Sequence, residues 1–127
     1  MSRWTTIDKI VSVEPGKSAS AIRNVPNTLA IFDSHFPRFP VLPGVLILGS
    51  LGELAARLLA EDTETTWRLA GAGQVGFRHF VQPGDQLELT VQLKERSETE
   101  AELSGDVKVD GKVVTRARRL TLVAVKP

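Results

Sequence analysis

Residues 34–60, SHFPRFPVLPGVLILGSLGELAARLLA, decide the fold of this chain. Prolines recur every third residue in the first half of the stretch, at Pro37, Pro40 and Pro43. Each proline fixes its own φ and disfavours the α region in the residue before it, so this half is expected to be an extended, rigid loop. A rigid loop can hold the single histidine of the stretch, His35, in one place.

The second half of the stretch predicts a helix from Gly44 to about Ala60. Its apolar residues cover most of the helical circumference, as in a helix that is buried on nearly all sides. Polar residues interrupt the run at helical spacing, at Ser50, Glu53 and Arg57. The run therefore falls short of the roughly 20 apolar residues that a membrane span needs, and a core helix is predicted.

Composition indicates a single domain over residues 1–127, with 42% hydrophobic and 24% charged residues. A formal net charge of +1 argues against a dedicated nucleic-acid binder. The chain has no cysteine, and its two histidines, His35 and His79, lack metal-ligand spacing, so neither disulfides nor a metal site are expected. The amino terminus lacks a signal-peptide pattern, which favours a cytoplasmic location.

The remaining sequence predicts strands. A hairpin is expected around the turn Pro15-Gly16, and longer strands are separated by the turns Pro83-Gly84 and Asp110-Gly111. The expected strand ranges are 4–13, 18–25, 67–80, 85–96, 99–109 and 112–125. This order predicts an α+β domain in which an antiparallel sheet wraps one long central helix, and whose open sheet edge pairs with a second copy in a dimer.

The string HFPRFPVLPGVL, residues 35–46, strongly resembles the active-site motif of the β-hydroxyacyl-acyl-carrier-protein dehydratases of the FabZ and FabA type, which have the hot-dog fold. Three further segments support the resemblance, FRHFVQPGDQLELTVQL, VEPGKSASAIRNV and VDGKVV, in the family's order and spacing. The resemblance implies dehydration of 3-hydroxyacyl groups carried on the phosphopantetheine of acyl carrier protein, in fatty-acid or polyketide-type biosynthesis. It implies no metal and no organic cofactor.

The same resemblance assigns roles within the motif. His35 would be the base that removes a proton from the substrate, and the carbonyl of Val41 would orient its imidazole. The backbone N–H of Gly44, after Pro43 at the start of the helix, would donate to the thioester oxygen, where the helix dipole favours negative charge. For Phe39 two interpretations are open, a residue at the mouth of the substrate tunnel or a packed residue of the loop.

One position departs from the family pattern. The resemblance places a glutamate or aspartate fourteen residues after the histidine, where it serves the partner's site in the dimer, but this chain has Gly49 there. Loss of a positioned acid typically lowers a rate by about 10²- to 10⁴-fold. Either Glu53, one helical turn later, replaces the acid, or a homologous partner in a heterodimer supplies it. Glu53 is equally expected to form an ion pair with Arg57.

Two other functions stay open. One is a non-catalytic subunit that binds acyl groups or carrier protein, which Gly49 favours. The other is a hot-dog thioesterase in which Asp33 or Glu53 activates water. For contact with the acidic carrier protein, the candidates are Arg38, Arg78 and Lys112.

Overall fold

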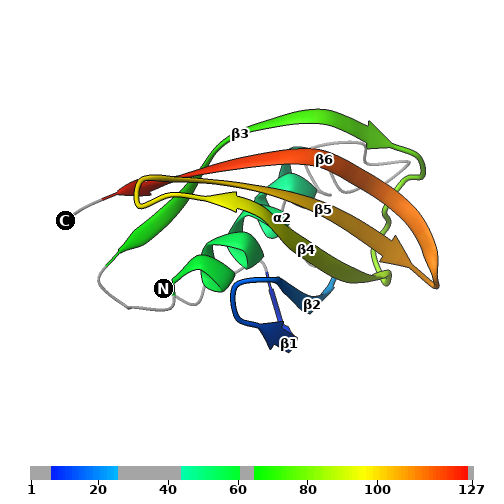
Figure 1. The fold of residues 1–127 in the computed structure, drawn as a ribbon. Coiled ribbons are helices and arrows are strands. Elements are labelled where there is room, and N and C mark those ends of the chain that lie inside the picture. Colours follow the sequence, from blue (N-terminus) through cyan, green and yellow to red (C-terminus); the bar gives the residue numbers. More distant parts are fainter. Residues whose placement is uncertain (1–6, 26–43, 61–64, 126–127) are drawn as a thin grey trace.

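The computed structural model describes residues 7–25, 44–60 and 65–125, which form one helix and six strands (Figure 1). The helix is α2 (Gly44–Leu59). The strands are β1 (Lys9–Glu14), β2 (Ser18–Asn24), β3 (Thr66–Phe77), β4 (Gln86–Arg96), β5 (Glu100–Val109) and β6 (Lys112–Val125). The sequence placed the helix and most strand boundaries within one or two residues.

All six strands form one antiparallel sheet in the order β1-β2-β4-β5-β6-β3. The hairpin between β5 and β6 turns at Asp110 and Gly111, whose φ angles are 51° and 81°. Two consecutive positive φ angles are what a two-residue hairpin turn of type I′ requires, and Asp-Gly is a preferred pair for it. The predicted hairpin is therefore confirmed, as is the α+β hot-dog plan.

Two predicted strands are too long at one end. The first strand was expected from residue 4; residues 4–6 lie outside the described part of the chain, and β1 begins at Lys9, after Ile7 and Asp8, which are not in the strand. Asp8 still bonds to β2. Its amide donates to the carbonyl of Ile22 and its carboxylate accepts the Asn24 amide. The third strand was expected to reach residue 80, but β3 ends at Phe77, and His79 lies exposed in a bend.

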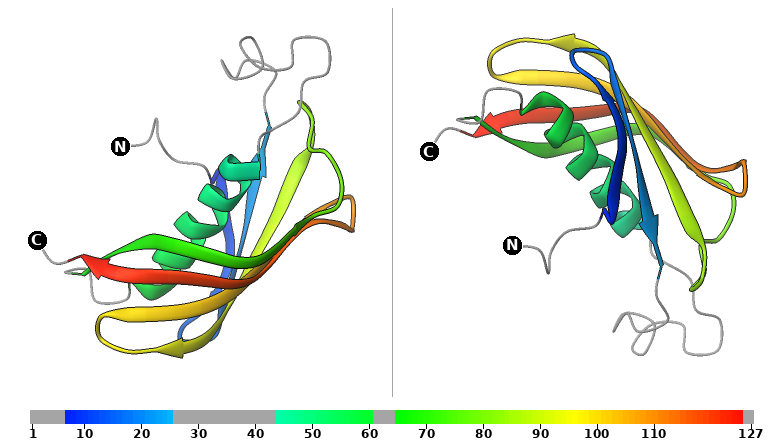
Figure 2. Two further views of the ribbon diagram at one scale, coloured as in Figure 1. Left: turned by 90° about the horizontal axis from the view of Figure 1, so that it is seen from above. Right: turned by 90° about the horizontal axis from the view of Figure 1, so that it is seen from below.

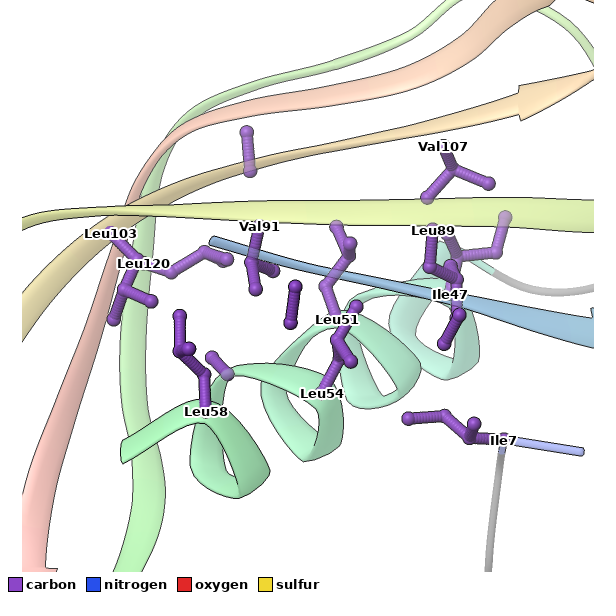
Figure 3. Packing of buried hydrophobic residues seen from close by; sticks show 14 of the residues in the cluster. Ile7, Ile47, Leu51, Leu54, Leu58, Leu89, Val91, Leu103, Val107 and Leu120 are labelled. Carbon is purple, nitrogen blue, oxygen red and sulfur yellow. The ribbon is translucent and has the colours of Figure 1, made fainter. Parts of the chain in front are cut away.

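The sheet curves around α2 and covers one side of it, as the two views in Figure 2 show. Leucines of the helix point at buried residues of the strands, among them Leu89, Val91 and Leu103 (Figure 3). Gly105 of β5 leaves room for this packing, since a Cβ there would lie 3.2 Å from Leu51 of α2. The helix thus rests directly on the middle of the sheet.

Arg96 of β4 caps the carboxyl end of α2. Its guanidinium donates to the Leu59 carbonyl at 3.0 Å and lies 5.3 Å from the ring centre of Trp67, at the start of β3. The last carbonyls of a helix lack partners within the helix, and a cation there also complements the dipole. One side chain therefore joins the helix to two strands.

Candidate active site

The helix α2 begins at Gly44, beside the end of β3. A Cβ on residue 44 would lie 2.6 Å from Cζ and 2.7 Å from Cε1 of the Phe77 ring. Carbon atoms that are not bonded to each other pack at about 3.5–4.0 Å, so the ring occupies the place of a side chain on residue 44. The first amides of a helix have no acceptor within it, so the amide of Gly44 is a donor suited to a developing negative charge.

Gly49 lies in different surroundings on the same helix. It is exposed, and among residues 7–25, 44–60 and 65–125 a Cβ built on it would meet no atom of another element within 4 Å. Val45, one turn earlier, is 72% exposed although it is apolar. The expectation of a helix buried on nearly all sides is therefore wrong for this face of its first turns, and the position of the family's acid is an open space.

Glu53, the alternative acid, forms an ion pair on the helix surface. Its Oε2 lies 2.8 Å from Nη2 of Arg57 in an i, i+4 ion pair. Gly49 lies one turn before Glu53, about 6 Å along the axis, and Arg57 one turn after it. The expected ion pair is thus present, and it holds the Glu53 carboxyl against Arg57 on the side of the next helical turn.

A buried arginine lies under this part of the helix. Arg23 of β2 is 8% exposed, and its Nη1 donates to Oγ of Ser50 at 2.9 Å, while Ser50 donates to the Leu46 carbonyl at 3.3 Å. Burial lowers the pKa of the Arg23 guanidinium, and the negative charges of Asp8 and Glu53 act in the opposite direction. The residue after Gly49 is therefore hydrogen-bonded to a buried cation on β2.

Arg23 was not among the predicted site residues, although the sequence carries a signal for it. In the strand SASAIRN, the inward positions Ala19 and Ala21 alternate with polar serines, and the same phase turns Arg23 inward. A period-two interpretation of this short strand would have identified Arg23. Its partner Ser50, on α2, is fully buried.

Two of the three proposed carrier-protein contacts can be placed. Arg78 follows the end of β3, Lys112 begins β6, and both are exposed. They lie at the same end of the sheet, where the Arg78 amide donates to the Val114 carbonyl at 2.8 Å. The remaining predicted site residues lie outside the described part of the chain: His35, Arg38, Phe39, Val41 and Pro43.

A separate hollow of about 510 Å³ lies on the face of the sheet that points away from the helix. Its lining is polar and includes Lys94, Arg116 and Arg118. Thr90 and Gln92 of β4 line it, while Leu89 and Val91 of the same strand face the helix. This hollow is therefore distinct from the site at the start of α2.

Within residues 7–25, 44–60 and 65–125 no group of three or more metal-ligating side chains comes together. In the same ranges no helix has both the length and the apolar character to cross a bilayer.

A long helix packed against one curved antiparallel sheet is the arrangement of a hot-dog protein. Residues 12–116 match the model of the ApeI-like family, described as ApeI dehydratase. The match covers well over half of the chain. The chain therefore belongs to this dehydratase family.

Curated relatives agree with the family model. The chain is 36% identical over 124 residues to 3-hydroxyacyl-(acyl-carrier-protein) dehydratase FabZ of Geobacillus thermodenitrificans, which covers 95% of this chain and 86% of the relative. It is 39% identical over 114 residues to the FabZ of Bacillus velezensis, covering 87% and 81%.

Solved structures show the same fold at lower identity. The dehydratase heterocomplex ApeI:P from Xenorhabdus doucetiae has a TM-score of 0.75 at 14% identity, covering 96% of this chain and 82% of that one. A Streptococcus mutans protein solved bound to acetyl CoA has a TM-score of 0.71 at 14% identity, covering 93% and 88%. The hot-dog architecture predicted from the sequence is thus confirmed.

Proposed function

We propose that the chain is a subunit of a (3R)-3-hydroxyacyl-acyl-carrier-protein dehydratase whose catalytic acid comes from a homologous partner. The observation that carries the proposal is the contrast on α2 between an open Gly49 and an ion-paired Glu53. FabZ relatives carry the dehydratase name, and a hot-dog neighbour was solved as a dehydratase heterocomplex.

In the proposed reaction His35 removes a proton from C2 of the acyl group. The amide of Gly44 donates to the thioester oxygen while negative charge develops on it. The C2–C3 double bond forms, the C3–O bond breaks, and the partner's carboxylic acid protonates the departing hydroxyl, so that water leaves. No metal or organic cofactor takes part, and the substrate arrives on the phosphopantetheine of acyl carrier protein.

The edge strand β3 supports the assembly that this requires. It lies at one end of the sheet order, and small residues are frequent in its middle, including Gly71, Ala72 and Gly73. One edge of this 12-residue strand pairs with β6, and the other edge, which pairs with no described strand, is a template for pairing with a second chain. We propose that β3 joins this chain to its partner, with the exposed face of α2 at Val45 and Gly49 beside the joint.

The first test assays the purified chain alone on a 3-hydroxyacyl carrier-protein thioester, with mass spectrometry for the loss of water. We expect the wild-type chain to be inert and Gly49→Glu to turn over, faster by about 10²- to 10⁴-fold. The control is Gly49→Glu combined with His35→Ala, which should be inert again.

Other results lead elsewhere. Wild-type activity that disappears in Glu53→Gln would make Glu53 the acid, in a self-sufficient enzyme. If neither the wild type nor Gly49→Glu dehydrates the substrate, catalysis by this chain is refuted. The open Gly49 then favours the second candidate, a non-catalytic subunit that binds acyl groups or carrier protein. Release of free thiol without dehydration would indicate a thioesterase.

A further inference from the structure

The aromatic ring of Phe77 lies against the residue whose amide the dehydratase proposal uses. Three atoms at the tip of the ring fall within 3.2 Å of where a Cβ of residue 44 would be. A glycine at this position therefore has two competing explanations. Either the substrate must approach the backbone closely, or the Phe77 ring needs the space.

The backbone that carries the ring is well fixed. Phe77 is the last residue of β3 and pairs with Thr115 of β6, and the next amide, that of Arg78, donates to the Val114 carbonyl at 2.8 Å. The ring itself is 53% exposed. One end of it contacts the helix start while the rest faces outward, so the ring can form a wall for a molecule bound there.

We propose that Phe77 is a positioning residue of the dehydratase site, holding the thioester beside the Gly44 amide. This inference rests on the proposed function for the role of that amide. An apolar ring next to the helix start excludes water from the donor, and a hydrogen bond to the thioester oxygen is stronger in the drier surroundings. The ring also limits the directions from which an acyl group can approach.

The contact itself is tested without any substrate. An aromatic ring shifts the NMR resonances of nearby protons, so Phe77→Leu should move the amide and Hα signals of Gly44. Phe80→Leu is the matched control, because Phe80 is a neighbouring phenylalanine that is 69% exposed and is not part of the proposed site. Unchanged Gly44 signals in Phe77→Leu would overturn the proposal.

The functional test separates the two explanations of Gly44. In the Gly49→Glu chain, Gly44→Ala should push the ring aside and lower kcat/KM by about 10²-fold, the effect of a displacement of roughly 1 Å near the chemistry. If the ring is the cause, adding Phe77→Leu to Gly44→Ala restores kcat/KM to the level of Phe77→Leu alone. If the new methyl group itself blocks the substrate, the double variant stays as slow as Gly44→Ala, which overturns the positioning role.

The division between kcat and KM distinguishes positioning from a purely structural role. Phe77→Leu should raise KM by about tenfold and lower kcat as well, with the melting temperature unchanged, since the ring holds the thioester beside the donor both in the bound complex and in the transition state. If the melting temperature falls together with the activity, the loss of activity is explained by loss of structure and the proposal is overturned.

A binding measurement separates failure of this inference from failure of the proposed function. The probe is 3-hydroxybutyryl pantetheine amide, a stable analogue of the thioester, added to the full chain and followed at the Gly44 amide. We expect Phe77→Leu to raise Kd by about tenfold, or 1.4 kcal/mol, while Phe80→Leu leaves it unchanged. If the analogue binds both variants equally, or does not bind the wild type, Phe77 has no positioning role, whatever the dehydration assay shows.

Discussion

The glycines of α2 differ in what surrounds them. Gly44 and Gly52 both face the edge strand β3, and a Cβ on either would lie 3.0 Å or less from a side chain, Phe77 in one case and Leu69 in the other. A Cβ on Gly49 would meet no other described element within 4 Å. Packing within the described part of the chain therefore explains two of the glycines and leaves the third unexplained.

The largest effect on stability is expected at the packed Gly52. Gly52→Val should lower the free energy of unfolding by about 1–3 kcal/mol, because Leu69 approaches with both its Cβ and its Cδ2 at 3.0 Å and the new side chain overpacks the contact. Urea unfolding followed by circular dichroism measures this. Gly49→Val serves as the control. An equal loss in both variants would show that the two sites do not differ in packing.

A smaller effect of opposite sign is expected at the open site. Gly49→Ala should raise the free energy of unfolding by up to about 1 kcal/mol, since alanine is the better helix former and its methyl group meets open space. The measurement is thermal unfolding of the chain alone. Destabilisation by this one methyl group would mean that the space is not open in solution.

The smallest effect is expected at Glu53. Glu53→Gln removes a surface ion pair with Arg57, whose side chain is 46% exposed, and such pairs contribute about 0–1 kcal/mol. In the Gly49→Glu chain it should leave dehydration within about twofold, because the restored glutamate supplies the proton. A large loss of activity on Glu53→Gln in the Gly49→Glu chain would indicate that Glu53 is the catalytic acid.

Much of the fold follows from local patterns in the sequence. Apolar residues at helical spacing gave α2, and the Asp110-Gly111 and Pro83-Gly84 turns gave the strand boundaries. At the second of these, Asp85 accepts the Gln82 amide at 2.9 Å, as expected of a turn residue. The strand ends at Lys9 and Phe77 were less predictable. A strand ends where its pairing with the neighbouring strand ends, and the neighbouring strand lies elsewhere in the sequence.

The candidate site was predictable where a motif marks it and not where packing makes it. Gly44 and Gly49 were identified from the resemblance of the motif to the dehydratase family, and Glu53 from its place one helical turn after Gly49. The contact of Phe77 with Gly44 joins residues far apart in sequence, and the bond of Arg23 to Ser50 joins a strand to the helix across 27 positions. Only the folded chain brings such pairs together.

The order of strands also has a kinetic consequence. Strands β4, β5 and β6 pair through short hairpins, but β2 must join β4 across about half of the chain, and the hydrogen bond from Gln86 to Asn24 spans 62 positions. Pairings this distant in sequence are slow to form, because the loop between them loses entropy before any contact compensates. We therefore expect the amino-terminal hairpin to dock late in folding, and the edge of β4 that receives β2 to stay exposed until then.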